Sequence, residues 1–428
     1  MIPTARRPPR RRRSPQSRLD SECQPREASF TYGRSFWLAY VSNSLITVAI
    51  ALLYRYADFV TLLGGTEFHL GWIVGVGMIG SLLMRLALGN YIDRYGTKFI
   101  WLGCTVLFVV VCFAHLAVST YAGVTIYLLR ILYCSAMAGI FGASMTFISA
   151  RAPSRRMGEL VGMLGTAGFL GIVAGTLLGD YLLGSLKADH GQVAWMFIAA
   201  GLIGALSFPF AWLAVRSECR PKTVAPQSLW GLLRRHRPGT ILLVGIAMGL
   251  GLGLPQTFLR TYAAQLAIPR IGLFFLVYCA AGLIARVGTR RWPERFGTRR
   301  IIVLGLGGIA VSLVLLLPVR AEWLLVVPAI TYGCSHAIIF PSVVAACGLA
   351  FPAANRGLAT VLVLAANDLG QLVGAPTAGA ALQYSECFGL PPYPTMFLLM
   401  ASLLTAVGLC YLALTRVSVA PVGQAPRA

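Results

Sequence analysis

Charged side chains are scarce in this sequence of 428 residues, because Asp, Glu, Lys and Arg together make up only 12% of it. A water-soluble domain carries about 25% charged residues, so this chain cannot cover a soluble surface. Acidic residues are the scarcest, with 14 Asp and Glu against 36 Lys and Arg. Hydrophobic residues make up 57%, and the mean hydropathy is +0.74. The composition excludes a soluble globule, a disordered chain and a fibrous repeat, and it predicts a polytopic membrane protein.

Motifs for metal, nucleotide or hydrolytic chemistry are also missing. The ten cysteines form no CxxC pair and no Cys/His metal spacing, and the sequence contains no HExxH. It contains no Walker loop for ATP, and Gly333-Cys334-Ser335-His336 does not match a serine-hydrolase motif. We therefore expect no enzyme activity, no metal and no cofactor.

Twelve hydrophobic runs are long enough to cross a bilayer, since a spanning helix needs roughly 20 apolar residues. These runs fall at about 36–62, 71–89, 99–118, 122–149, 158–183, 193–215, 239–262, 271–288, 301–318, 323–349, 357–382 and 395–415. An even number of spans places both termini on one side of the membrane. The spans therefore predict an all-α integral membrane protein with short loops.

The basic residues indicate which side that is. Segments on the side of the termini hold 28 of the 36 Lys and Arg, the opposite loops hold three, and five lie within spans. Because basic residues concentrate in cytoplasmic loops, both termini are predicted to be cytoplasmic, in a plasma or inner membrane. This distribution also accounts for the net charge of +22 without nucleic acid as a partner.

The longest inner loop, 216–238, separates six spans from six spans and contains Trp230 in a segment typical of a short interfacial helix. The predicted organisation has five parts. These are a disordered basic cytoplasmic tail (1–34), a first six-helix bundle (35–215), a cytoplasmic linker (216–238), a second six-helix bundle (239–415) and a second tail (416–428).

The two halves are related by an internal repeat. The loop after the second span reads Asp93-Arg94-Tyr95-Gly96-Thr97-Lys98, and the loop after the eighth reads Glu294-Arg295-Phe296-Gly297-Thr298-Arg299, 201 residues later. An offset of 199 aligns Gly171 and Gly175 with Gly370 and Gly374. Two six-span repeats predict a site near the middle of the membrane, where the halves meet.

The segment Gly89-Asn90-Tyr91-Ile92-Asp93-Arg94-Tyr95-Gly96-Thr97-Lys98 resembles the loop signature GxLADRxGRK of the major facilitator superfamily. It lies between spans 2 and 3, where that family carries it. With the twelve spans and the basic middle loop, the resemblance covers about residues 35–415. It implies two pseudo-symmetric six-helix bundles. It also implies a gate formed by this loop and its repeat, at Gly89, Asp93, Arg94, Gly96, Lys98, Glu294, Arg295 and Gly297.

Span 5 carries a second pattern that is similar to a signature of proton antiporters. Its glycines keep the spacing of that signature, while Thr176 stands in place of the Pro and Asp180 in place of the last Gly. The matching positions are Gly162, Gly171, Gly175 and Gly179. Glycines four residues apart let two helices approach closely, so helix packing alone is the alternative interpretation.

Four charged residues lie within predicted spans 1, 4 and 7: Arg55, Asp58, Arg130 and Arg260. A charge at the bilayer centre costs about 2.5–3.5 kcal/mol on insertion scales, so such residues face a cavity or a partner. The resemblance makes spans 1, 4, 7 and 10 the lining of a cavity. Three arginines against one aspartate then predict a substrate site for an anion. The alternative is that Arg55 and Arg260 extend to the membrane interface.

Two carboxylates are candidates for proton coupling. Asp58 is close in depth to Arg130, and we expect these two to form a gating pair. Asp368 lies near the middle of span 11 with no cation at matching depth, because Arg85 and Arg286 are placed near inner span ends as gate or topology residues. Burial without a cation favours a protonated carboxylate. Asp368 is therefore the predicted proton carrier, and a hydrogen-bonded packing role is the alternative.

Together these features predict a monomeric secondary active transporter of a small organic solute, preferably an anion. We expect alternating access, coupling to protons, and export rather than import. Its partners would be the solute, protons and the lipid bilayer. Two alternatives stay open, a multidrug efflux antiporter for drug-like substrates and a non-transporting receptor or channel on the same scaffold.

Overall fold

The computed structural model describes residues 32–151, 156–184, 186–216, 239–289, 292–351 and 356–415. Within these ranges every regular element is a helix. The elements of the first half are α2 (Arg34–Leu52), η2 (Leu53–Arg55), α3 (Tyr56–Leu62), α4 (Glu67–Ala114), η3 (His115–Ala117), α5 (Val124–Arg151), α6 (Met157–Leu182) and α7 (His190–Val215). The predicted interfacial helix around Trp230 lies outside the described residues.

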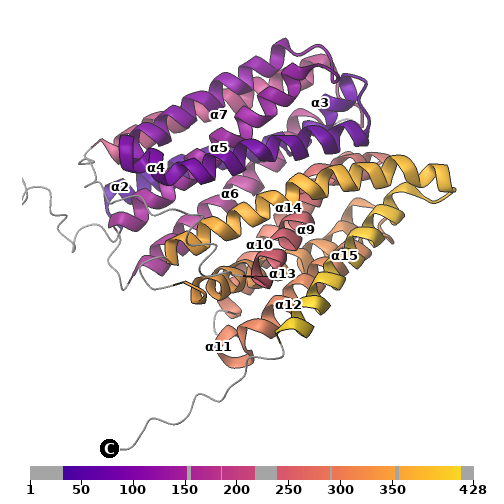
Figure 1. Ribbon diagram of the computed structural model, residues 1–428. Helices are drawn as coiled ribbons and strands as arrows, with labels where there is room; N and C mark the ends of the chain where they lie inside the picture. The colour runs from indigo at the N-terminus through magenta and orange to yellow at the C-terminus, as the bar shows by residue number, and fades with distance from the viewer. Residues whose placement is uncertain are drawn as a thin grey trace, which may run out of the picture.

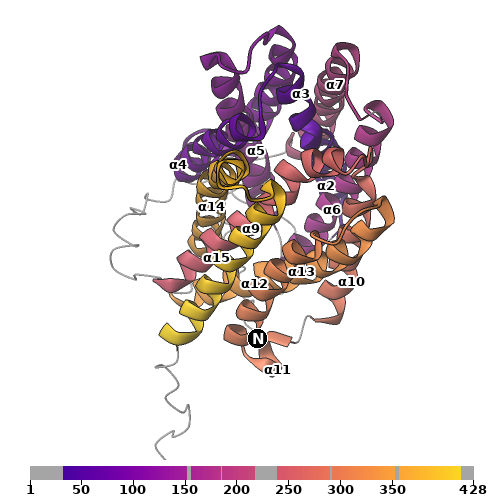
Figure 2. The same cartoon turned by 90° about the vertical axis from the view of Figure 1, so that its right-hand side faces the viewer.

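The second half repeats this order. Its elements are α9 (Thr240–Gln265), α10 (Gly272–Gly288), α11 (Trp292–Phe296), α12 (Thr298–Leu315), η4 (Glu322–Leu325), α13 (Val326–Leu349), α14 (Arg356–Ser385), η6 (Glu386–Phe388) and α15 (Pro392–Leu414). Figure 2 shows the halves as two groups of helices, the first above the second. The predicted fold of two six-helix bundles is confirmed.

Ten helical segments in the described ranges are long and apolar enough to cross a membrane. The α4 helix supplies two of them, since it is interrupted at Gly96. The two remaining crossings are α10, a shorter apolar helix of 17 residues, and α14, whose middle carries Asn367, Asp368 and Gln371. Polar side chains in the middle of a membrane helix indicate that α14 faces the protein interior.

The repeated loop has the same backbone turn in both halves. Gly96 has φ 83° and Gly297 has φ 84°, a region that a side chain disfavours. Gly96 lies between the second and third crossings, and Gly297 lies between the short helix α11 and the next crossing, α12. The structural equivalence of these glycines agrees with the repeat that the sequence predicts.

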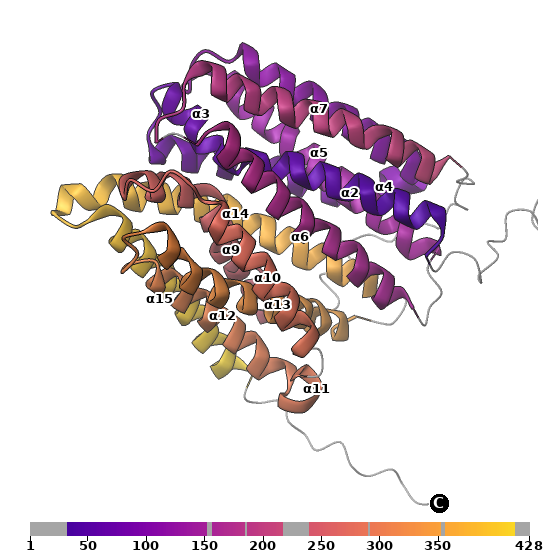
Figure 3. The ribbon, with the colours of Figure 1, turned by 180° about the vertical axis from the view of Figure 1, so that it is seen from behind.

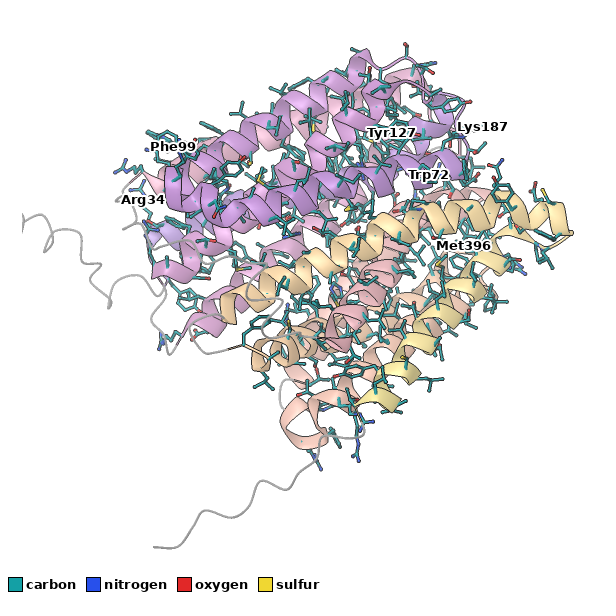
Figure 4. All side chains as sticks on the ribbon, in the orientation of Figure 1. Arg34, Trp72, Phe99, Tyr127, Lys187 and Met396 are labelled. Carbon is teal, nitrogen blue, oxygen red and sulfur yellow. The ribbon has the colours of Figure 1, made fainter. Side chains whose placement is uncertain are left out.

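The bundle has two ends, which we name by the chain segments that lie there. The terminal face is the end where α2 begins at Arg34 and α15 ends at Leu414. The far face is the opposite end, with Lys187 and the loop between α6 and α7 (Figure 4). The ribbons of the two halves lie close together at the far face and spread apart toward the terminal face (Figures 1 and 3).

Exposed tryptophans mark both ends of the bundle. Those near the terminal face are Trp37, Trp212 and Trp292, and those near the far face are Trp72, Trp195 and Trp323. Tryptophan concentrates at the two membrane–water interfaces because its ring is apolar and its N–H is polar. Their arrangement agrees with helices that cross the bilayer between the two faces.

Close contacts between α6 and α2 explain two of the span 5 glycines. A Cβ on Gly171 would lie 2.5 Å from Thr47, and one on Gly175 would lie 2.3 Å from the carbonyl oxygen of Val48. Gly179 is less tightly packed, with Arg55 at 3.4 Å from its Cβ position. Gly162 differs, since no described atom lies within 4 Å of its Cβ position.

Candidate functional site

A cavity of about 340 Å³ lies between the two halves. Its walls come from the first crossing, α4, α5 and α6 in the first half, and from α9 and α14 in the second. The expected contribution of span 10 is wrong, because α13 supplies no lining residue and α14 takes that place. The polar lining includes Arg85, Arg130, Gln256, Asn367, Asp368 and Gln371.

Arg130 reaches the cavity from α5 and lies between two aromatic rings. Its guanidinium carbon is 4.5 Å from the ring centroid of Tyr56 and 4.7 Å from that of Tyr133. Ring faces attract a cation, and this attraction strengthens where water is excluded. The Nε of Arg130 is buried and has no hydrogen-bond partner among the described residues. Arg130 therefore presents an uncompensated positive charge and a free donor at the cavity wall.

A glycine on α4 makes this position of Arg130 possible. A Cβ on Gly77 would lie 2.5 Å from the Cγ of Arg130 and 3.2 Å from its carbonyl oxygen. Any larger residue at position 77 would push α4 away from α5. The arginine is thus fixed by backbone packing on one side and by two tyrosines on the other.

A group of four charged residues closes the far-face side of the cavity, and we call it the far-face gate: Arg55, Asp58, Asp180 and Arg260. Asp58 binds both arginines, with its Oδ2 at 2.8 Å from Arg55 Nε and its Oδ1 at 3.0 Å from Arg260 Nε. Both arginines are only 1% exposed. Since Arg55 and Asp58 belong to the first half and Arg260 to α9, the pair of Asp58 with Arg260 ties the halves together.

The short 3-10 turn η2 helps to build this gate. It interrupts the first crossing between α2 and α3, so that Arg55 ends the turn and Asp58 lies in the first turn of α3. Residues three apart on a helix lie on one face, which brings the carboxylate to the guanidinium. Arg260 adds a hydrogen bond of 3.0 Å from its Nη2 to the carbonyl oxygen of Leu186.

Asp180 is the gate residue to which sequence reasoning gave no role. Its Oδ1 accepts a hydrogen bond of 3.1 Å from Arg55 Nη1, while its Oδ2 accepts one of 2.6 Å from the backbone N–H of Gly272. The N–H of Ile271 donates to it as well, at 3.2 Å. The carboxylate of α6 thus caps the N-terminus of α10 in the other half, where a negative charge is favourable. The available signal was a carboxylate at the end of a span, where the antiporter signature has glycine.

One expectation and one alternative about these residues are wrong. Asp58 forms its ion pairs with Arg55 and Arg260, so it does not pair with Arg130. Arg55 and Arg260 do not extend to the membrane interface, because both are buried in the gate. Of the four predicted substrate-site residues, only Arg130 lines the cavity. Counting residues from a helix end gives depth, but it does not show which face meets which neighbour.

Asp368 forms an ion pair, contrary to the expectation that no cation lies at its depth. Its Oδ2 is 2.5 Å from Arg85 Nε and 2.5 Å from the Oγ of Ser81, both on α4. The helices α4 and α14 lie side by side (Figure 1), with the Cβ position of Gly71 only 2.4 Å from the carbonyl oxygen of Ala375. This packing lets the long side chain of Arg85 reach Asp368. A role of Asp368 in proton coupling stays a prediction.

The residues of the predicted loop gate lie at the terminal face. The side chains of Asp93 and Glu294 are outside the described part of the chain. Arg94 and Arg295 are exposed, and each lies over the ring of the next residue, 5.3 Å from the centroid of Tyr95 or Phe296. Gly89 has no described atom within 4 Å of its Cβ position. Lys98 is partly buried at the start of the third crossing. The gate role of this loop stays a prediction.

No group of three or more His, Cys, Asp or Glu side chains that could hold a metal ion occurs in the described ranges. The cavity and the far-face gate consist of the side chains given above. Their arrangement provides a binding space between two bundles and a set of breakable ion pairs at one end of it.

Comparison with known proteins agrees with this architecture. The family model of the Major Facilitator Superfamily (MFS) matches residues 35–293 and 267–427. An uncharacterized MFS-type transporter of Methanocaldococcus jannaschii is 31% identical over 150 residues, which are 34% of this chain and 36% of that protein. The alignment thus spans about a third of that relative.

Solved structures are similar over nearly the whole chain. A mutant of the nucleoside transporter NupG superposes with a TM-score of 0.74 at 16% identity, covering 90% of this chain and 99% of that one. An auto-inhibited POT family peptide transporter gives 0.67 at 11% identity, with 92% and 99% covered. A bacterial homolog of the human lysosomal transporter Spinster, inward-facing and occupied, gives 0.64 at 14% identity, with 89% and 96% covered.

At these identities the solved structures establish the fold, while the family model establishes the relationship. The two matched ranges together cover residues 35–427, which is nearly the whole chain. The chain belongs to the major facilitator superfamily and is a membrane transporter of that type.

Proposed function

We propose that the protein is a secondary active transporter of a small organic anion. The observation that carries this proposal is the charge balance around the cavity. Arg55 and Arg260 are neutralised in the far-face gate, and Arg85 is paired with Asp368. Arg130 is left with two aromatic rings and no carboxylate. The binding space therefore carries one net positive charge, which favours a carboxylate or another monovalent anionic group.

The size and polarity of the cavity support a small organic solute. Its volume of about 340 Å³ lies at the lower end of the roughly 300–1,000 Å³ that is typical of ligand pockets. Tyrosine, methionine and phenylalanine side chains supply apolar contacts, and Gln256, Asn367 and Gln371 supply hydrogen bonds. Both the cavity and the gate are formed within one chain, which supports a monomer as the transport unit.

The position of the gate supports alternating access. The far face is held shut by the Asp58–Arg260 ion pair and by the hydrogen bond from Gly272 to Asp180, both between the halves, while the ribbons diverge toward the terminal face (Figure 3). With cytoplasmic termini, this is an inward-facing arrangement. Opening to the other side requires Asp58 to leave Arg260, and Asp180 to leave the N-terminus of α10. The halves then rotate about the central site.

Counterflow in proteoliposomes against a metabolite library tests this function, with and without a pH gradient. We expect the accumulating solute to be an organic anion. A cationic or uncharged hydrophobic solute would instead support the alternative of drug-like efflux. A solute that binds but is never exchanged would support a receptor, and uncoupler-insensitive flux down a gradient would support a channel.

Proton coupling is proposed to act through Asp368. Protonation would remove its negative charge and weaken the pair with Arg85, which joins α4 of the first half to α14 of the second and so would shift the balance between conformations. Export is the proposed direction, because the glycine spacing of α6 is similar to that of proton antiporters.

Replacing Asp368 with asparagine should abolish accumulation driven by a pH gradient while solute exchange at equal pH continues. The reason is that asparagine cannot bind and release a proton but can still accept the hydrogen bond from Ser81. Accumulation is measured in proteoliposomes across a pH series. The Asp368→Asn variant leaves Arg85 without its carboxylate, so the Arg85→Gln, Asp368→Asn double variant is the control for that unpaired charge. Gradient-driven uptake by the Asp368→Asn protein would exclude this coupling site.

Orientation is tested by thiol labelling. Cys387 is exposed in η6 on the far face, whereas Cys23 and Cys219 lie outside the described ranges, in segments predicted to be cytoplasmic. In intact cells a membrane-impermeant maleimide should label Cys387 and leave Cys23 and Cys219 unmodified until the cells are opened. Peptide mass spectrometry gives the readout, and the reverse pattern would invert the topology.

A further inference from the structure

The internal repeat allows the two contacts between the halves to be compared residue by residue. Arg85 on α4 corresponds to Arg286 on α10, at an offset of 201 residues. At the offset of 199, Asp368 on α14 corresponds to Phe169 on α6. In the α4–α14 contact, arginine therefore meets aspartate. In the α6–α10 contact the equivalent acid is replaced by a phenylalanine, whose ring packs against Tyr278 at 6.2 Å.

Arg286 lies close to the cavity, on the side of the terminal face. Its Nη1 is 3.7 Å from the position that a Cβ on Gly165 would occupy. Gly168, three residues further along α6, lines the cavity. Because α6 runs from the terminal face to the far face, Gly165 is nearer the terminal face by about one helical turn. An anion that leaves the cavity on that side passes in front of Arg286.

The space in front of Arg286 is open. No described atom lies within 4 Å of the Cβ positions of Gly162 and Gly168, which flank Gly165 on α6. Arg286 itself is half-buried and forms no ion pair with any described residue. Arg286 lies in the last turn of α10, at the end of the span that an anion would pass on its way to the terminal face, and charged residues on such a path typically mark a route for ions or substrates.

Neighbouring side chains support a polar site. The hydroxyl of Tyr278, two turns earlier on α10, is 2.7 Å from Nδ1 of His336 on α13, and their rings are stacked. Tyr278 and His336 of the second half are within electrostatic range of Arg286, and Gly165 of the first half lies beside it. No described carboxylate competes for the guanidinium. The site differs in this respect from that of Arg85.

We propose that Arg286 forms a second anion-binding site, one helical turn from the cavity toward the terminal face. It receives the carboxylate, sulfonate or phosphonate group of the solute between its release from Arg130 and its escape to the terminal face, or in the opposite order during entry. The identity of its solute rests on the proposed function, but the existence of the site does not.

Charge-selective labelling of the full-length protein tests this site without knowledge of the solute. Gly165 is replaced with cysteine, which its surroundings accommodate because the Cβ would be in ordinary contact with Arg286. The exposed Cys387 and Cys410 are replaced with serine. The anionic 2-sulfonatoethyl methanethiosulfonate and the cationic 2-(trimethylammonium)ethyl methanethiosulfonate are then compared, with peptide mass spectrometry at position 165 as the readout.

We expect the anionic reagent to react about tenfold faster, since a nearby unit charge raises the local concentration of one monovalent reagent several-fold and lowers that of the other. Adding Arg286→Gln should reduce this ratio to about one, whereas Arg286→Lys should preserve most of it. A cysteine at Leu364, the repeat equivalent of Gly165 and one turn before Asp368, is the matched control. The ratio there should stay near one, because Arg85 is neutralised.

An equal rate for both reagents at position 165, or a preference that survives Arg286→Gln, would overturn the proposal. Lack of reaction with either reagent would overturn it as well, because a transit site must be reached by water-borne anions. None of these outcomes depends on transport. Failure of the anion-transporter function would therefore be seen separately, in the counterflow experiment.

Discussion

Replacing Arg130 with alanine is expected to lower the affinity for the transported anion by at least about 30-fold, since removing one partner of a desolvated charge pair costs 2 kcal/mol or more. The protein should still fold, because Arg130 has no ion pair to lose and its removal relieves the cost of a buried cation. Binding of the solute identified by counterflow is measured by isothermal titration calorimetry. Folding is checked from the size-exclusion profile and the thermal transition.

Arg130→Lys is the matched control, because it keeps the positive charge and loses the planar guanidinium group. Lysine keeps the positive charge, but it cannot reproduce the planar contact with both Tyr56 and Tyr133 or the paired donors of a guanidinium. We expect an affinity between those of the native protein and Arg130→Ala. Unchanged affinity of the alanine variant at normal expression would contradict the proposal that the cavity selects anions through this residue.

The Asp58→Asn substitution should open the far face. It leaves Arg55 and Arg260 buried beside one another with Asp180 as the one described carboxylate in the gate. Breaking a buried ion pair by removing one partner costs about 3–5 kcal/mol. A change of that size shifts an equilibrium between two conformations by more than about a hundredfold. The closed far face therefore becomes the minor state, and transport falls because the cycle is held in the other state.

Electron paramagnetic resonance can measure this change. One spin label is attached to native Cys387 and a second to Ser119→Cys, both on the far face and in different halves, after the other accessible cysteines are replaced. We expect a longer distance in Asp58→Asn than in the parent. The double variant Asp58→Asn, Arg260→Gln removes the excess positive charge and should recover a large part of the shorter distance. An identical distance in all three proteins would show that these ion pairs do not hold the gate.

The membrane crossings could be predicted from the sequence because each is a one-dimensional pattern. A run of about 20 apolar residues is a sufficient signal for a spanning helix. The repeated loop predicted that the two halves have the same fold, and the matching turns at Gly96 and Gly297 agree with this. Gly171 and Gly175 fit the packing alternative, since glycines four apart let two membrane helices approach closely.

The partners of the buried charges could not be predicted in the same way. Counting residues placed Arg85 at the end of its span and Asp368 in the middle, yet the structure joins them at 2.5 Å. The count omits helix tilt, the rotation of each helix about its axis and the reach of a long side chain. For the same reason the sequence analysis paired Asp58 with Arg130, whereas the structure pairs it with Arg260. Depth in the membrane therefore reduces the number of possible partners for a buried charge, but it does not identify the partner.

The role of Asp180 was missed for a different reason. Its main partners include the backbone N–H groups of Ile271 and Gly272, which have no signature in a sequence. A pattern search compares side chains with side chains, so a carboxylate bound by another helix's backbone looks unpartnered. The residue is visible beforehand only as an acidic group at the end of an apolar span.

The contact between Asp180 and Gly272 also restricts how this protein can evolve. A Cβ at position 272 would lie 2.7 Å from the carboxylate oxygen of Asp180. Natural variation to alanine or serine would therefore separate the helix end from its cap, although position 272 supplies no side chain to the cavity or the gate. Among descendants of this sequence, we expect substitutions at Gly272 only together with a substitution at position 180, although the two positions lie in different halves.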